Sequence, residues 1–380
     1  LTTYLNLQYS KRNTYEQIKT DRIFAPDSML SQDAFTKYPT SSYYLGYGLG
    51  YEINEKWDFS YDGRLSFNDA RNTSINVSEI DKISQQQLIT QNKALVNNKA
   101  KNYNFNQGFS LKHKLDTLGS EWTNDLSYTY YPSNSNQVFN TVFITPQYPN
   151  SGGDGEIDNK LHFFSAQTNL IKKLPKQITV ETGLKTTNVW FSNETDYFRS
   201  DNSTRVKDGF RTRSYNYTEN IHSAYLQASR NISGLIIKAG VRMENTNMKG
   251  HQKIPADTSF TQHRTDLFPY IYLSKGLMKI AGYELRGYLV FRRTISRPAY
   301  EYLNPFPRYV DQYLNEVGNP SLRPQFTYNY EANISVDERP ILAIGVNDTK
   351  DIFNQVVYQS DTSRSLAYRT YDNLGKNKEI

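Results

Sequence analysis

The stretch that decides the fold is residues 325–336, Gln-Phe-Thr-Tyr-Asn-Tyr-Glu-Ala-Asn-Ile-Ser-Val. Every second side chain in it is apolar. One face carries Phe326, Tyr328, Tyr330, Ala332, Ile334 and Val336, and the other carries only polar groups and Glu331. A period of two over this length is typical of a β-strand with one apolar face. The stretch therefore predicts a long strand whose two faces meet different surroundings.

A proline-rich loop precedes this strand. Another strand, expected over 285–293, breaks at Ser296-Arg297-Pro298, and the loop then carries Asn304-Pro305, Pro307 and the run 318–325, Gly-Asn-Pro-Ser-Leu-Arg-Pro-Gln. Proline cannot donate a ladder hydrogen bond, and it biases the preceding residue towards extended backbone. The loop is thus expected to be stiff and shaped, although a rigid turn with no further role explains the prolines equally well.

Composition limits the classes that fit. The chain has 380 residues, 37% of them hydrophobic, and a mean hydropathy of -0.72. No run of about 18 apolar residues occurs, so no transmembrane helix is expected. Cysteine is absent, which excludes disulfides and thiolate metal sites. The net charge of +6 comes from interspersed charges without a basic run, and no nucleic-acid partner is expected.

The same alternation recurs along the chain, starting at Leu5, Leu7 and Tyr9. Because the chain begins and ends inside a strand, no signal peptide is expected and the chain is interpreted as an excerpt of a longer protein. About 14 strands are expected. Besides the first segment and the two strands above, they are expected near 43–53, 57–68, 103–111, 122–130, 164–170, 178–190, 215–229, 235–244 and 267–273, with one more hairpin ending near 373–375.

Short turns and long polar connections alternate strictly. Long loops are expected at 11–40, 69–99, 132–158, 192–213 and before Thr265, with a short helix within 80–96; short turns are expected at 54–56, 116–120, 172–176, 231–234, 275–281 and 337–340. A meander places all the long loops at one end, as in outer-membrane barrels and unlike compact soluble domains. The prediction is an all-β, antiparallel, up-and-down transmembrane β-barrel in the bacterial outer membrane.

Charges and aromatic residues agree with a membrane wall. Asp58, Arg64, Lys238 and Glu331 all fall on the polar faces of their strands, where they avoid lipid. Trp57, Trp122 and Tyr283 each follow a short turn and so share one height. These three aromatic residues are the predicted girdle at one membrane boundary.

The loop motif resembles the barrel of TonB-dependent outer-membrane receptors, in particular the outer-membrane β-barrel group common in Bacteroidetes-type bacteria. The motif residues are Arg297, Pro298, Asn304, Pro305, Gly318, Asn319, Pro320 and Pro324. Further matches are 219–225, 239–244 and 373–375, so the resemblance covers the second half of the chain well and the first half only through its rhythm of strands and loops.

The resemblance implies a barrel of about 22 strands around an N-terminal plug. It implies ligand-gated import of a scarce solute, such as a siderophore, cobalamin, glycan or peptide, with energy relayed by TonB. The implied partners are outer-membrane lipid, a TonB-type protein acting through a missing N-terminal region, and a surface lipoprotein. The chain shows no plug and no energy-coupling box, so residues 1–380 are expected to be a single barrel domain truncated at both ends.

Two other classes remain open. One is a structural or scaffold barrel subunit without transport of its own, which the absence of an upstream plug would favour. The other is a soluble carbohydrate-binding β-sandwich, which solubility without detergent would favour. For the importer, aromatic residues of the loop are candidate ligand contacts or loop-packing residues: Tyr300, Tyr302, Phe306, Tyr309 and Tyr313.

Signals for catalysis or metal binding are weak. No nucleophile elbow, phosphate loop or zinc-protease motif occurs, so no enzyme and no cofactor are expected. His251 and His263 share one expected loop and are interpreted as solvated side chains. Asp154, Glu156 and Asp158 have calcium-like spacing, but the turn glycine and final glutamate of an EF-hand loop are missing. No metal site is predicted.

Overall fold

A computed structural model describes residues 1–201, 204–209, 211–254, 257–280, 282–305, 308–311, 313–336, 339–360 and 366–380. The described strands form one 17-stranded sheet. They are β1 (Thr2–Ala25), β2 (Ser28–Asn54), β3 (Trp57–Lys82), β4 (Gln87–Lys114), β5 (Glu121–Thr145), β6 (Ser151–Leu174), β7 (Ile178–Asp201), β8 (Thr204–Lys207), β9 (Arg213–Ile232), β10 (Leu235–Ile254), β11 (Thr258–Ile280), β12 (Tyr283–Ser296), β13 (Arg308–Asp311), β14 (Leu314–Glu316), β15 (Gln325–Val336), β16 (Arg339–Gln359) and β17 (Ala367–Glu379). The described helical segments are the 3-10 turn η1 (Ile83–Gln85) and the short helix α1 (Tyr300–Leu303).

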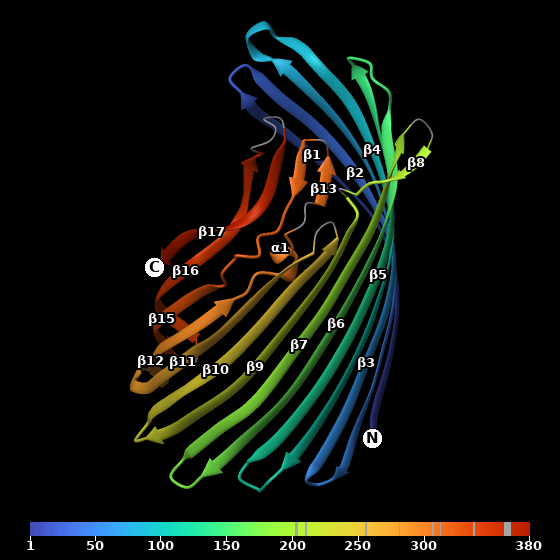
Figure 1. Cartoon of the computed structure of the whole chain (residues 1–380). Coiled ribbons are helices and arrows are strands. Elements are labelled where there is room, and N and C mark those ends of the chain that lie inside the picture. Colours follow the sequence, from blue (N-terminus) through green and yellow to red (C-terminus); the bar gives the residue numbers. More distant parts are fainter. Residues whose placement is uncertain are drawn as a thin grey trace.

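The long strands follow one another as an antiparallel meander (Figure 1). Each pairs with the next from β1 to β7, then through β9, β10, β11, β12, β15 and β16 to β17. In the described part of the chain, no ladder joins β1 to β17. The predicted all-β antiparallel meander is confirmed. The described sheet has 17 strands where about 14 were expected, because β8, β13 and β14 add short strands to the meander.

The short turns at one end of the sheet are built by polar side chains. The carboxamide oxygen of Asn54 accepts hydrogen bonds from the backbone of Lys56 and Trp57, at 2.9 and 3.0 Å. Asp116 and Asn231 accept in the same way within their own turns. Such side chains replace the backbone partners that a tight turn lacks, which is why the sequence marked these turns clearly. Residues 337–338 of the last predicted short turn lie outside the described residues.

The predicted long loops are wrong. The chain at 11–40, 69–99, 132–158 and 192–213 continues mostly as strand, and each pair of strands meets in a short connection at the far end, such as 26–27 between β1 and β2. The expected helix within 80–96 is reduced to η1, the loop before Thr265 is largely β10 and β11, and β11 runs on to Ile280 through the expected turn at 275–281. Where both faces of a strand are wet, apolar alternation disappears although the ladder persists, and the sequence signal is lost.

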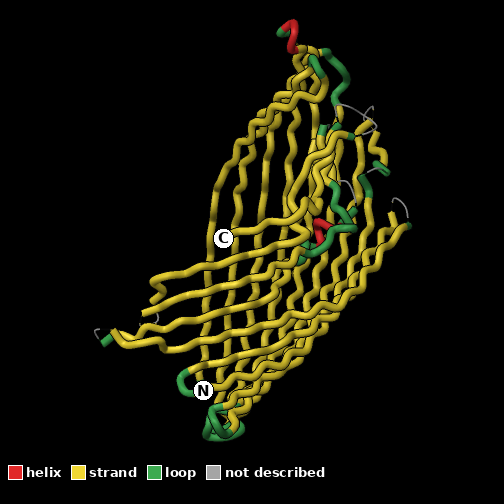
Figure 2. Tube along the Cα trace, turned by 90° about the vertical axis from the view of Figure 1, so that its left-hand side faces the viewer, coloured by secondary structure: helices red, strands yellow, loops and turns green. Residues whose placement is uncertain are grey.

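The two faces of the sheet differ as the alternation predicted. On one face Leu184, Leu226 and Val241 are 60%, 56% and 45% exposed. On the opposite face Lys238 pairs with Glu181 at 3.6 Å, one example of the charges gathered there. Figure 2 shows the sheet curving around an interior. The charged face lines this interior, because Glu244, on the same side of β10 as Lys238, bonds to Arg297 of the segment that crosses it. No helix in the described residues is long and apolar enough to cross a membrane.

Candidate functional site

Residues 297–324, here called the strap, leave the sheet after β12 and return to it at β15. The described parts of the strap contain α1, β13 and β14. Figure 1 shows α1 and β13 inside the space that the curved sheet surrounds. The strap is the segment that carries the proline-rich motif, so the motif lies in the interior.

Apolar contacts fix the strap to the inner face of β9 and β10. Leu303 and Leu322 are each 1% exposed and form one cluster with Tyr215, Tyr217 and Met248. Burial of a leucine side chain stabilises by roughly 1.5–3 kcal/mol. Pro298 and Pro324, at the two ends of the strap, are also buried. On β11, Gln262 adds a hydrogen bond from its side chain to the carbonyl oxygen of Pro320, at 2.8 Å.

Polar contacts fix the other side of the strap to β16 and β17. The side chain of Asn373 on β17 accepts from the backbone nitrogen of Arg323 at 2.9 Å and donates to its carbonyl oxygen at 3.0 Å. The guanidinium of Arg323 meets Asp351 at 2.8 Å. Tyr302 stacks on Tyr371 with ring centroids 3.8 Å apart. The strap therefore bridges two walls that are far apart in the sequence.

Two further contacts extend this bridge. Strand β14 pairs in parallel with the start of β17, and Glu316 there accepts from Arg369 at 3.0 Å. Across the interior, the Asn92 side chain on β4 donates to the Tyr313 hydroxyl at 3.4 Å. The strap thus contacts β4, β9 to β11, and β16 to β17, and it crosses the polar interior.

The centre of the motif is a close crossing of two backbone segments. The nitrogen of Gly318 donates to the carbonyl oxygen of Asn304 at 2.7 Å, and the nitrogen of Asn319 donates to that of Tyr302 at 2.6 Å. A Cβ at Gly318 would lie 2.3 Å from the Asn304 carbonyl oxygen. The Asn319 side chain accepts from the Ser321 nitrogen and donates to the Tyr371 carbonyl oxygen. These contacts explain why glycine and asparagine stand at these two positions.

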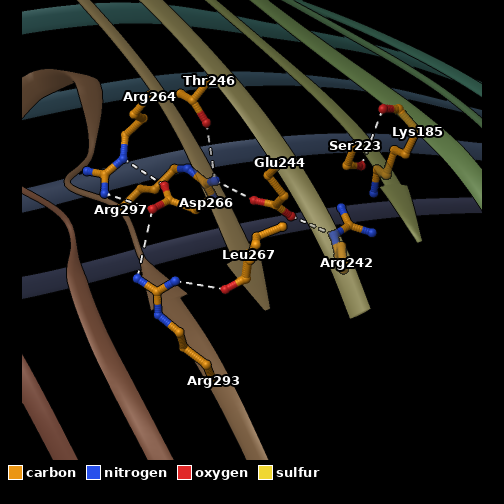
Figure 3. Close-up of polar contacts among 10 residues, drawn as sticks. All are labelled: Lys185, Ser223, Arg242, Glu244, Thr246, Arg264, Asp266, Leu267, Arg293 and Arg297. Atoms are coloured by element: carbon orange, nitrogen blue, oxygen red, sulfur yellow. Dashed lines mark hydrogen bonds and ion pairs between the residues drawn. The ribbon is translucent and has the colours of Figure 1, made fainter. Parts of the chain in front are cut away.

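An ion network joins the start of the strap to the wall (Figure 3). Arg297 donates to Glu244 on β10, and Arg242 donates to the same carboxylate at 2.6 Å. The Arg297 guanidinium also lies 3.4 Å from the hydroxyl of Thr246. Glu244 is 7% exposed, so two cations neutralise one buried carboxylate.

A second carboxylate continues the network on β11. Asp266 accepts from Arg264 at 2.7 Å, and the Arg293 guanidinium lies 3.9 Å from it (Figure 3). Arg293 also covers the ring of Phe326, with 4.1 Å to the centroid. Phe326, which the alternation placed on the apolar face, is only 8% exposed because these cations cover it.

A third carboxylate, Glu219, lies on β9 opposite Met248 of the apolar cluster. The Tyr217 hydroxyl donates to Glu219 at 3.0 Å. Acidic and basic side chains therefore alternate along the inner wall beside the strap.

The structure brings most of the predicted motif residues together in the strap, as described for Arg297, Asn304, Gly318 and Asn319. Pro305 is half-buried there. Among the predicted aromatic contacts, Tyr302 and Tyr313 pack or bond within the molecule. Phe306 and the side chains of Tyr300 and Tyr309 lie outside the described residues. Ligand contact by these aromatic residues stays a prediction.

The three predicted girdle residues follow short turns on the exposed apolar face. Trp57 stacks on His113 at 4.0 Å, and His113 is the register partner of Trp122. The Trp122 indole donates to Thr168 at 2.8 Å while the ring stays 38% exposed. Tyr283 is 57% exposed at the start of β12.

The weak metal candidates each have local partners. His251 contacts Asp257 at 2.9 Å and His263 contacts Asn247 at 2.7 Å. Asp154 forms an ion pair with Arg205 at 2.6 Å, and Asp158 with Lys160 at 2.9 Å. The described residues contain no cluster of three or more ligating side chains.

Sequence reasoning missed the wall residues that hold the strap. Glu244, Tyr371 and Asn373 lie far from the motif in the chain, and their roles are visible only after folding. Glu244 and Asn373 do belong to the segments 239–244 and 373–375 that matched the resemblance. Reading these matched segments together with the motif could have suggested that they are in contact.

A curved antiparallel meander with an apolar outer face and a charged inner face defines the wall of a membrane β-barrel. A family model described as "Outer membrane protein beta-barrel family" matches residues 113–380. The chain belongs to this family, and it is a β-barrel protein of the bacterial outer membrane. No curated protein matches the chain.

Two solved structures are similar. The translocator domain of the autotransporter NalP from Neisseria meningitidis has 11% identity and a TM-score of 0.25, over 76% of this chain and 81% of that one. The β domain of the Bordetella autotransporter BrkA has 13% identity and a TM-score of 0.26, over 76% and 91%. Scores this low carry nothing about what this chain does.

The predicted TonB-coupled import of a scarce solute is wrong. The family that matches is described only as an outer-membrane β-barrel family, and this description gives no basis for energised import. The assignment to TonB-dependent receptors is likewise not supported, whereas the coarser resemblance to an outer-membrane β-barrel group is confirmed.

Proposed function

We propose that the chain forms the wall of a passive, water-filled passage through the outer membrane and that the strap sets its width. The observation that carries the proposal is the strap itself, which crosses the polar interior and is anchored on both sides. Leu322 holds it to β9 and β10, and Asn373 holds it to β17. A segment that is anchored on both sides, by buried leucines on one and by hydrogen bonds on the other, is a fixed constriction rather than a mobile lid.

The chemistry of the inner wall supports a hydrated passage. Glu181, Lys238 and Arg242 line it below the strap, and each has an opposite charge within reach. Such pairs stay solvated in water and would be costly in lipid. The proposal requires no energy coupling and no enzymatic role.

The passage also requires a closed wall, because unpaired strand edges are not tolerated in hydrocarbon. We therefore propose that the edges of β1 and β17 find partners in the membrane. The barrel of about 22 strands implied by the resemblance is one way to close it and stays a prediction. Disulfide crosslinking of cysteines placed along β1 and β17 in whole cells would test direct closure of one edge on the other.

Single-channel conductance in planar bilayers tests the passage. The variant replaces residues 299–323 by a short Gly-Ser linker, and the control trims the β3–β4 hairpin at 79–91, which leaves the Asn92 contact to the strap in place. We expect the strap variant to conduct at least about twofold more than the natural chain, since conductance grows with open cross-section, and the control to be unchanged. Equal conductance of all three, or no conductance from any, would refute the proposal.

A second candidate function rests on the length of the strands, which exceeds the thickness of the membrane. Strand β4 has 28 residues, whereas about 9–11 cross a bilayer, so more than half of it projects beyond the membrane. We propose that these hairpins offer a surface to a partner such as a surface lipoprotein. Trimming 79–91 would then abolish co-purification of that lipoprotein while leaving conductance intact.

A further inference from the structure

Strands β1 to β4 carry a continuous aromatic row on their apolar face. Tyr9, Tyr43, Phe67 and Tyr103 are register partners in succession, with ring centroids 5.0, 5.9 and 4.9 Å apart. Tyr9, Tyr43 and Tyr103 are 58%, 49% and 45% exposed. Tyrosine rings that are open on the lipid side are typical of a membrane boundary.

The distance of this row from the short turns matches the position of the second membrane boundary. Ten residues separate Phe67 from Trp57 along β3. At about 3.3 Å per residue and a tilt of about 35–45°, they span about 25 Å, the height of the apolar band of an outer-membrane barrel. Trp57 follows a short turn, so the aromatic row marks the boundary on the side of the tall hairpins, which is the outer leaflet.

Directly above the row the same face becomes basic. Lys11 and Lys101 lie two residues further along their strands than the row, Arg71 and Lys99 four residues, and Lys37 six residues, so all five share its face. All five are exposed, and the outward acid among them is Asp69, 3.4 Å from Arg71. In the described part of the chain, no carboxylate forms an ion pair with the four lysines.

Below the cations the aromatic row lines an apolar groove of about 800 Å³. Its walls include Leu7, Leu45, Leu65 and Phe105. The groove lies within the expected apolar band, where acyl chains are the solvent. The five cations stand about 5–15 Å above it, at the depth of lipid headgroups.

We propose that this surface binds a phosphate-bearing lipid of the outer leaflet, with acyl chains in the aromatic groove and phosphates on the basic cluster. Charge complementarity selects an anionic headgroup, and several separate cations suit a headgroup with more than one phosphate. The basic cluster lies next to the apolar groove, so a molecule with both a charged headgroup and acyl chains fits this surface better than a free anion does. The proposal rests on the placement in the outer membrane and is independent of the passage.

Lipid retention tests the proposal. The full chain is reconstituted in phosphatidylcholine nanodiscs containing a small fraction of bisphosphorylated lipid A, extracted gently, and its bound lipid is counted by native mass spectrometry. The variant combines Arg71→Gln, Lys99→Gln and Lys101→Gln. The control combines Lys112→Gln, Lys185→Gln and Lys238→Gln, which removes three cations from the inner face. Heat-modifiable migration on gels verifies that both are folded.

We expect the natural chain and the control to retain lipid A at least about tenfold better than the variant, because each cation near a charged lipid surface adds to the attraction. Replacing lipid A by its dephosphorylated form should remove the difference. Lys99→Arg with Lys101→Arg should keep retention, since charge is preserved. Equal retention by the variant, or full competition by millimolar inorganic phosphate, would overturn the lipid site, and neither outcome bears on conductance.

Discussion

At Gln107 a polar side chain lies on the lipid-facing side of β4 and is nevertheless only 8% exposed. The hydroxyl groups of Tyr47 and Tyr61 both donate to its carbonyl oxygen, the first at 3.2 Å. The Tyr47 ring lies over Gly63, where a Cβ would come within 2.2 Å of it. One glycine thus makes room for a tyrosine whose hydroxyl satisfies the side-chain carbonyl oxygen of Gln107, since an unsatisfied polar group in lipid costs several kcal/mol.

The close crossing of backbone segments at Gly318 gives a prediction for the addition of a single methyl group. Gly318→Ala should destabilise the folded chain by about 1–3 kcal/mol, because the new methyl group meets the Asn304 backbone and the strap must shift. Urea unfolding in detergent micelles, followed by tryptophan fluorescence, measures the loss. Gly209→Ala is the matched control, since nothing lies within 4 Å of its Cβ position. Equal midpoints for the two variants would contradict the crossing.

At the scale of elements, the strap combines a four-residue helix, two short strands and several prolines. Alone, none of these would be stable, because short helices and two-stranded ribbons are marginal in water. The wall supplies what they lack: apolar contacts on β9 and β10, and backbone and side-chain partners on β16 and β17. The long hairpins show the converse, since ladder hydrogen bonds hold polar strands where no apolar face exists.

Truncation of the apolar anchor tests the strap as an element. Leu322→Ala should cost about 2–5 kcal/mol, the usual range for a buried leucine in a packed cluster. Limited proteolysis is the second readout, and we expect cleavage within 297–324 to appear only in this variant. Leu118→Ala, in a short turn and 71% exposed in the natural chain, serves as the control. A strap that resists protease in both would show that Leu322 is not an anchor.

At the scale of the whole molecule, two surfaces of opposite character share one sheet. The ladders set the register, and a register step of one residue would exchange the lipid face for the lumen face. Leu226 and Gln227 are neighbours in β9 and illustrate this, because the first is 56% exposed on the apolar face and the second opposes Glu181 on the inner face.

This pair gives the prediction for the molecule in its membrane. Leu226→Arg should reduce stability in lipid vesicles by about 2–4 kcal/mol, since the charge meets hydrocarbon near mid-depth. Gln227→Arg should have a much smaller effect, because its side chain is hydrated and close to Glu181. Folding yield into vesicles, read from heat-modifiable migration, measures both. A larger loss for Gln227→Arg would reverse the assignment of faces.

The sequence by itself determined the all-β class, the order of the long strands, most of the tight turns and the split between apolar and polar faces. Each is a local property: alternation at 325–336 or an asparagine such as Asn54 in a turn carries its signal within a few residues. The resemblance of the strap motif pointed to the correct group of outer-membrane barrels but to a wrong energised function.

Tertiary structure alone decided the rest. The polar segments 69–99 and 132–158 became strands because neighbouring strands supplied ladder partners, which no local pattern records. The strap found its place because Leu322 met Tyr215 and Tyr217, and Arg323 met Asn373, across long sequence distances. Contacts of this kind form only when the whole sheet curves around the strap. That curvature results from all the strand pairings together, so no single segment of the sequence predicts it.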